Sequence, residues 1–165
     1  MGYSKKELLE KYTTFIQNAT GEELEVLEHM LHGWEGKRTN QYGSYIGSWL
    51  QADRQWVDDQ TYEVIIPLNK TFENPLEIVH GGVTATLLDT AMGGLANESA
   101  PDGHASVTME MKINYLKPGK GSFLRSESIM LSKSRRTIVT EGKVYNDKDI
   151  LIAHATATFY IIPIS

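Results

Sequence analysis

The chain has 165 residues, of which 41% are hydrophobic and 22% charged, and this length favours a single globular domain. It has no cysteine, which excludes disulfides, thiolate metal sites and cysteine nucleophiles. Its 16 basic and 21 acidic residues give a formal charge of −5, so the basic bias of a nucleic-acid-binding protein is missing. There is neither the apolar run of a signal peptide nor a stretch of roughly 18 apolar residues that could span a bilayer. We therefore expect a cytoplasmic protein that binds neither nucleic acid nor membrane.

The N-terminal 41 residues form a unit with helical character. Apolar residues at helical spacing predict two short amphipathic helices between residues 4 and 32, separated at Gly21, and a polar connector over 33–41. We divide the chain into a helical extension (1–41) and a main domain (42–165). The extension is expected to pack on the domain as a cap, and the alternative is a surface that faces lipid or a partner.

The main domain alternates between strand patterns and a single apolar helix. Residues 42–68 predict two strands separated by a polar turn at 58–60. Residues 79–97 are small or apolar on nearly every side, which is typical of a buried helix. One helix among consecutive antiparallel strands favours an α+β fold. Four further strands are predicted, at about 107–115, 121–132, 136–146 and 150–162.

The strand at 107–115 shows a regular alternation. Its apolar residues are Val107, Met109, Met111, Ile113 and Tyr115, each separated by a polar neighbour. Because successive side chains of a strand point to opposite faces, this pattern predicts that the five share one face.

A single carboxylate, Asp89, lies inside the predicted buried helix. Burying it costs several kcal/mol unless it is hydrogen-bonded, paired or solvated. No Lys or Arg lies between Thr71 and Met111 to neutralise it. The structural alternative to a functional role is a carboxylate held by the hydroxyl of Thr86 or Thr90, or one that points into a wet cleft.

Two glycines begin the same helix. His80-Gly81-Gly82 precedes the first apolar turn, and unshielded backbone N–H groups at a helix N-terminus form an anion or oxyanion site. The alternative is a glycine pair needed for close packing. Gly81 and Asp89 are eight residues apart, which is about 12 Å along a helix, so one substrate could reach both only if they come from two chains. A functional role for both thus predicts a dimer with symmetry-related sites.

These residues together resemble the PaaI-like acyl-CoA thioesterases of the hotdog-fold superfamily, over roughly residues 42–162. The resemblance is carried by HGG followed by LLDTA, by an Asn six residues before the His and an Asp nine after it, and by the pattern T-x-E-x-x-I-x-Y from Thr108 to Tyr115. It implies an antiparallel β-sheet wrapped around a long central helix, with two subunits joined edge to edge into one continuous sheet.

The resemblance also implies roles for five residues. Asp89 would be the nucleophile or general base, and the backbone N–H of Gly81 would polarise the thioester carbonyl. Asn74 would position the reacting groups, and Thr108 would support the carboxylate or the attacking water. His80 would orient Asn74 or lie near the carbonyl.

The expected reaction needs no metal or separate cofactor, because a thioester is already activated and coenzyme A is part of the substrate. Basic side chains at turns could bind its phosphates through charge-assisted hydrogen bonds, although turns also carry ordinary solvated charges. Leu88 and Met92 are candidates for an acyl slot or else core residues. The substrate-binding candidates are Gly82, Leu88, Met92, Lys133, Arg135 and Arg136, with Met109 for the acyl slot and Lys117 and Lys120 at a second turn for the phosphates.

Other functions are weighed against this one. The main alternative is a non-catalytic acyl-CoA-binding module, such as a sensor, on the same fold. A hotdog dehydratase would need a His–carboxylate pair, and His80 and Asp89 are too far apart within one chain. No G-x-S-x-G motif indicates a serine hydrolase, and His29 with His32 lacks a third metal ligand. Self-association as a homodimer or homotetramer is expected.

Overall fold

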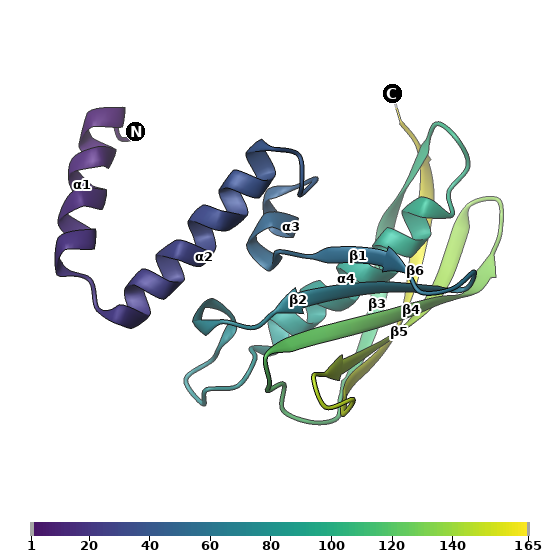
Figure 1. Cartoon of the computed structure of the whole chain (residues 1–165). Coiled ribbons are helices and arrows are strands. Elements are labelled where there is room, and N and C mark those ends of the chain that lie inside the picture. The colour runs from purple at the N-terminus through teal and green to yellow at the C-terminus, as the bar shows by residue number, and fades with distance from the viewer. Residues whose placement is uncertain (1, 165) are drawn as a thin grey trace.

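A computed structural model describes residues 2–164 as N-terminal helices followed by a six-stranded antiparallel sheet that curves around one long helix (Figure 1). The strand order is β1-β2-β4-β5-β6-β3. The α+β class is confirmed, as is the sheet wrapped around a central helix that the resemblance implied. The helices are α1 (Lys5–Asn18), α2 (Gly21–Arg38), α3 (Tyr45–Leu50), the short 3₁₀ helix η1 (Lys70–Phe72) and α4 (Gly81–Glu98). The strands are β1 (Asp53–Trp56), β2 (Thr61–Pro67), β3 (His104–Tyr115), β4 (Phe123–Lys133), β5 (Thr137–Asn146) and β6 (Leu151–Pro163).

The core lies between α4 and the concave face of the sheet. Every second residue of β5 is buried, and the apolar side of α4 packs onto that face. Leu88 and Met92 are completely buried and lie over Gly142. A Cβ on Gly142 would come within 3.0 Å of both side chains, so the glycine lets the helix approach the sheet closely. Full burial of a Leu or Met side chain contributes roughly 1.5–3 kcal/mol, which makes this contact a major source of stability.

The two edges of the sheet differ. β1 has four residues, all exposed, and is the kind of short polar edge that does not recruit other strands. β3 has 12 residues and, within residues 2–164, pairs only with β6, so its other edge is open. It exposes Val107 and Met109 beside that edge. A long edge strand with exposed apolar side chains is a template for pairing with a second chain.

A β-bulge interrupts β3 at Met109. Thr108 lies opposite Phe159, but Glu110 lies opposite Thr158, so Met109 is an extra residue with no partner. The bulge changes which residues face α4, because side-chain direction alternates along a strand. Thr108 before the bulge and Tyr115 after it both face α4. The predicted uninterrupted alternation is therefore wrong: Val107 lies opposite Tyr160 and Tyr115 lies opposite Ala153, so these two side chains are on different faces of the sheet.

Two predictions for the N-terminal region are wrong. The polar connector predicted over 33–41 is helical as far as Arg38. Gly33 and Gly36 let this part of α2 lie directly against Ser48 and Tyr42, and a Cβ on Gly33 would overlap the carbonyl oxygen of Ser48. The strand predicted to include Tyr45 and Trp49 is instead the six-residue helix α3. The strand β1 begins only at Asp53.

His29 connects α2 to the main domain. Its Nε2 lies 2.7 Å from the carbonyl oxygen of Trp49, and its Nδ1 lies 2.9 Å from Nε2 of Gln51. The ring also packs edge-on against Phe72, which is fully buried. Both ring nitrogens are thus used within the chain, and the middle of α2 is fixed to the main domain.

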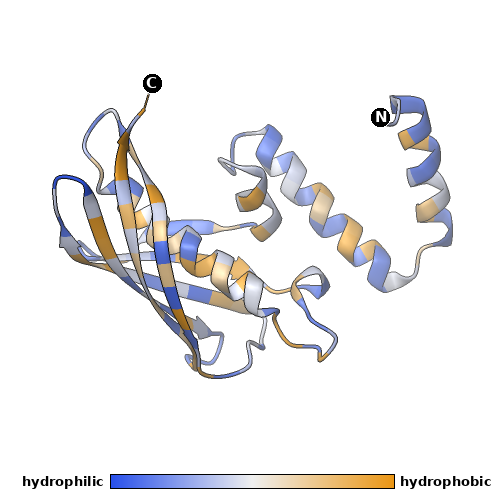
Figure 2. Cartoon of the chain, turned by 180° about the vertical axis from the view of Figure 1, so that it is seen from behind, coloured by the Kyte–Doolittle hydropathy of each residue, from blue (hydrophilic) through white to orange (hydrophobic). Residues whose placement is uncertain are grey.

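Helix α1 projects away from the sheet (Figure 1), and none of its side chains is buried. The prediction of a cap packed on the domain is therefore wrong for α1. Figure 2 shows apolar bands on α1 and α2 that lie outside the core of the sheet. No helix within residues 2–164 has both the length and the apolar character needed to cross a bilayer.

Candidate functional site

The N-terminus of α4 presents a free backbone donor. His80 is the N-cap: its Nδ1 accepts the Gly82 N–H at 2.9 Å, and its carbonyl oxygen accepts the Val83 N–H at 2.9 Å. Among residues 2–164, no group accepts a hydrogen bond from the N–H of Gly81. This N–H lies at the positive end of the helix dipole, where it can stabilise negative charge on a bound oxygen.

A pocket of about 370 Å³ adjoins this donor. Asn74 and Gly81 both line it, so the structure brings these two candidates together. The Oδ1 of Asn74 accepts the Leu76 N–H at 2.9 Å, and its side-chain NH₂ has no acceptor within the described part of the chain. Lys117 lines the same pocket. The pocket thus combines two free N–H donors with a positive charge.

Tyr115 supports this end of α4 and was missed as a site candidate. Its hydroxyl donates to the carbonyl oxygen of Gly81 at 2.9 Å, and its ring would lie 3.5 Å from a Cβ on that glycine. The sequence pattern placed Tyr115 among the apolar residues of its strand. The spacing could have indicated its role. Thr108 and Tyr115 are seven residues apart, and in a regular strand such residues point to opposite faces, so both can face one helix only if a bulge lies between them.

Asp89 forms a second group, further along α4. The hydroxyl of Thr108 donates to its Oδ1 at 2.8 Å, and the carboxylate is only partly buried. The hydroxyl of Thr86 donates instead to the carbonyl oxygen of Gly82, so the Thr86 alternative is wrong. Because Thr108 belongs to β3, the pair lies beside the open edge of the sheet.

Within one chain the two groups are separate. Helix α4 is unbroken from Gly81 to Glu98, so Gly81 and Asp89 are about 12 Å apart along its axis. One bound carbonyl cannot contact both residues of the same helix. Each chain therefore holds these two candidate groups apart.

The candidates for substrate binding are distributed elsewhere. Leu88 and Met92 lie in the core, and the N–H of Gly82 is used by His80. The ammonium of Lys133 donates to the carbonyl oxygen of Ser99 at 2.6 Å, just beyond the C-terminus of α4. The turn with Lys133, Arg135 and Arg136 is thus at the opposite end of α4 from Gly81, about 27 Å away along 18 residues.

The sequence is similar to those of known proteins. The model of the thioesterase superfamily matches residues 76–153, which include Gly81, Asp89 and Thr108. YigI of Escherichia coli, a medium/long-chain acyl-CoA thioesterase, is 29% identical over 51% of this chain and 63% of its own. SSO2140 of Saccharolobus solfataricus, named "Putative esterase", is 35% identical over 60% of this chain and 70% of its own. The chain thus spans about 63% of the length of the YigI relatives.

The fold is similar to those of solved structures. The BH2602 protein from Bacillus halodurans, determined with CoA, is 38% identical with a TM-score of 0.86, over 93% of this chain and 99% of that one. The thioesterase HI1161 of Haemophilus influenzae shares the fold, with a TM-score of 0.68 at 18% identity over 71% of this chain and 82% of that one. The fold and the site define a hotdog protein of the PaaI-like type. The chain belongs to the thioesterase superfamily.

Proposed function

We propose that the protein hydrolyses the thioester bond of acyl-CoAs, at sites formed between two copies of the chain. The observation that carries this proposal is the pair of groups on α4: a free Gly81 N–H at its tip, and an Asp89 carboxylate held by Thr108 in its middle. A positioned carboxylate and an oxyanion donor are the two elements that thioester hydrolysis requires.

The chemistry follows from these two groups. The N–H of Gly81 stabilises the negative charge that develops on the carbonyl oxygen. As general base, Asp89 takes a proton from a water molecule whose oxygen attacks the carbonyl carbon, and the thiolate of CoA leaves with that proton. As nucleophile, Asp89 instead attacks the carbonyl carbon and displaces CoA as its thiolate, which leaves an anhydride. Water then hydrolyses the anhydride to the free acid and the Asp89 carboxylate, and the thiolate takes up the proton that is released. In both routes the hydroxyl of Thr108 orients the carboxylate, and the amide of Asn74 orients the water or the substrate.

Two copies complete the site in this proposal. The open edge of β3 pairs with the same edge of a second copy, which continues the sheet and covers Val107 and Met109. Asp89 and Thr108 lie beside this edge, so pairing brings them to the partner molecule. A two-fold axis then generates two equivalent sites, each with the Gly81 end of one copy and the Asp89 of the other.

The substrate class is supported by the relatives. YigI is named as a medium/long-chain acyl-CoA thioesterase, and the BH2602 structure was determined with CoA. We therefore place medium- and long-chain acyl-CoAs first among substrates. Lys117 offers a positive charge at the mouth of the pocket for a phosphate, and the cluster around Lys133 is the second candidate, contributed from the far end of α4.

The test is the release of free CoA from short-, medium- and long-chain acyl-CoAs, followed with a thiol-reactive dye. Asp89→Asn should lower kcat about 10²–10⁴-fold, the usual contribution of a positioned acid–base group. Glu98→Gln is the matched control, because it removes one carboxylate from an exposed position of the same helix. Undiminished hydrolysis by Asp89→Asn would contradict the assignment of Asp89.

The alternative function is an acyl-CoA sensor that binds without hydrolysis. It is favoured if the unmodified protein hydrolyses no acyl-CoA of the panel yet binds one in isothermal titration calorimetry. Asp89→Asn would then keep that affinity, since a sensor needs the pocket and not the carboxylate.

A further inference from the structure

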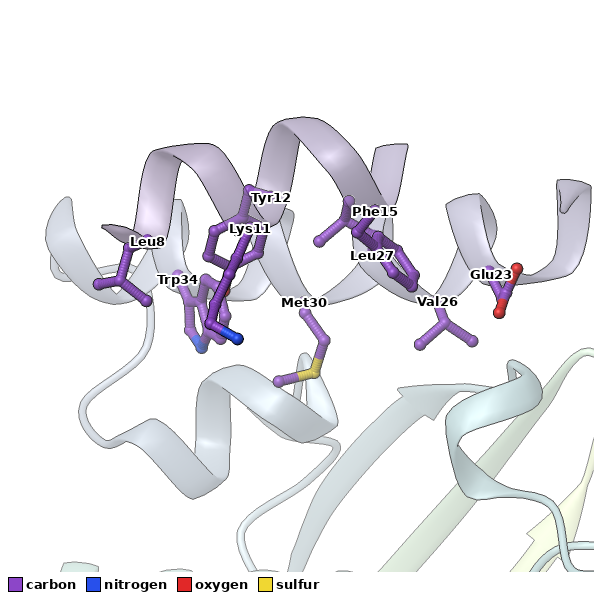
Figure 3. A pocket seen from close by; sticks show the side chains of 9 residues that line it. All are labelled: Leu8, Lys11, Tyr12, Phe15, Glu23, Val26, Leu27, Met30 and Trp34. Atoms are coloured by element: carbon purple, nitrogen blue, oxygen red, sulfur yellow. The ribbon is translucent and has the colours of Figure 1, made fainter. Parts of the chain in front are cut away.

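The helical extension carries a large apolar surface that its own chain does not cover. Helices α1 and α2 form an open hairpin, joined at Ala19 and Thr20. A groove of about 390 Å³ runs between them, and Figure 3 shows side chains of both helices along it. The residues that line the groove are Leu8, Lys11, Tyr12, Phe15, Glu23, Val26, Leu27, Met30 and Trp34.

Helix α1 needs a contact that the single chain does not provide. It has 14 residues, and isolated helices of up to about 12–15 residues are marginal in water. Its N-terminus is well capped, because Ser4 and Glu7 form a capping box, but none of its side chains is buried. Most helical stability comes from packing an apolar face, so this face requires a partner.

The exposed area is large enough for a stable interface. Eight large apolar side chains on α1 and α2 are between 38% and 68% exposed. With on the order of 100 Å² uncovered on each, they present roughly 600–800 Å². Monomers rarely expose apolar patches beyond about 300–600 Å², and a standard interface buries about 800 Å² per partner. These side chains are Leu8, Leu9, Tyr12, Phe15, Ile16, Leu24, Leu31 and Trp34.

The charges on the helical extension favour a second copy of the chain over an anionic lipid surface as the partner. Between residues 2 and 39 there are seven acidic and five basic residues, so an anionic lipid surface is repelled. The two helices differ in charge: α1 carries three lysines (5, 6 and 11) and two glutamates (7 and 10), whereas the first half of α2 carries four glutamates (22, 23, 25 and 28) and no basic residue. An α1 that enters the groove parallel to α2 brings basic charge to acidic charge. A second copy of this chain supplies such a helix.

We propose that the α1–α2 hairpins of two copies interlock, with the α1 of each copy in the groove of the other. Two helical hairpins then form a four-helix bundle with a common apolar core. The hairpin lies on the side of the sheet that carries α3 and β1, away from the β3 edge (Figure 1), so this interface is distinct from the one proposed for the active site. The TM-score of 0.86 to BH2602 over 93% of the chain means that much of the extension has a counterpart there.

The experiment measures the mass of the full chain by sedimentation equilibrium over a range of concentrations. Tyr12→Glu with Phe15→Glu places two charges on the apolar face of α1, and should halve the mass or raise the dissociation constant at least about 100-fold. Thr14→Glu with Gln17→Glu is the matched control, which adds the same charge to exposed polar positions on the opposite side of α1 and should leave the mass unchanged.

Three results would overturn the proposal. The first is an identical mass for the unmodified chain and both double variants at every concentration, which means that the apolar face of α1 does not hold a second copy. The second is an equal loss of mass in both double variants, which indicates a charge effect without the apolar contact. The third is co-sedimentation of the unmodified chain with phosphatidylglycerol vesicles, abolished by Tyr12→Glu with Phe15→Glu without a change in mass, which assigns the face to lipid. Thioester hydrolysis is not part of this readout, so the proposed function can fail independently.

Discussion

Replacing Gly81 with proline would remove one backbone N–H from the site and little else. Gly81 is the first residue of α4, where proline is favoured because its fixed φ suits a helix and its N–H has no intrahelical partner. His80 has φ −60° and ψ 135°, in the extended region that a residue before proline prefers. The N–H that is lost has no acceptor within residues 2–164, so no hydrogen bond of the fold is broken.

The expected effect is large on catalysis and small on stability. Loss of one oxyanion donor costs about 10²–10³-fold in kcat, or roughly 3–4 kcal/mol of transition-state stabilisation. The free energy of unfolding should stay within about 1 kcal/mol of the parent, because a compatible proline reduces the freedom of the unfolded chain. Gly81→Ala is the control: it keeps the N–H, and its Cβ would lie 3.5 Å from the Tyr115 ring, an ordinary contact.

The assay is steady-state hydrolysis of the best acyl-CoA of the panel, with thermal unfolding of each variant in parallel. The reasoning requires Gly81→Pro to lose far more kcat than Gly81→Ala while both unfold at temperatures close to that of the parent. If the proline variant turns over within about threefold of the alanine variant, the N–H of Gly81 does not stabilise the oxyanion.

Two further changes test the residues that hold these groups. Thr108→Val removes the 2.8 Å hydrogen bond to Asp89. Hydrogen bonds to charged groups contribute about 1.5–3 kcal/mol, and the solvent access of this pair favours the lower end of that range. We therefore expect kcat to fall about tenfold, with KM nearly unchanged. Thr108→Ser should restore most of the lost activity. Thr108→Val should have no effect in an Asp89→Asn background, and an equal loss in both backgrounds would mean that Thr108 does not act through Asp89. Tyr115→Phe removes the 2.9 Å hydrogen bond to the Gly81 carbonyl oxygen. A net contribution of about 0.5–1.5 kcal/mol from that hydrogen bond predicts a decrease in kcat of roughly 2–13-fold at constant KM. A rise in KM alone would make Tyr115 a binding residue instead.

Much of the main domain could be predicted from the sequence because its signals are local. The start of α4 follows from glycines beside His80, and its course follows from an apolar run in which Asp89 is the only charge before Glu98. The strand pairs follow from period-two patterns separated by polar turns. The position of Asp89 and Gly81 on one unbroken helix, and their separation, could therefore be derived before the structure was known.

The rest depends on contacts that no local pattern records. Helix α3 has only six residues, and its aromatic residues Tyr45 and Trp49 are as typical of a strand as of a helix. The contact of Trp49 with Phe72, which belongs to another element, is not visible in the local sequence. The end of α2 depends on Gly33, which fits against Ser48 of α3, and on Gly36, which fits against Tyr42; both contacts are visible only in three dimensions. The hydrogen-bond partner of Asp89 lies 19 residues away on β3. Local spacing suggested only a threonine of the same helix, and it was the family resemblance that pointed to Thr108.

The extra residue in β3 divides that strand into two segments of opposite phase. The segment ending at Thr108 serves the middle of α4, and the segment that includes Tyr115 serves its tip. The count of residues at this point cannot change without rotating one segment away from the helix. Relatives should therefore keep one extra residue here, and an alignment gap placed at this point would misassign the residue that supports the carboxylate.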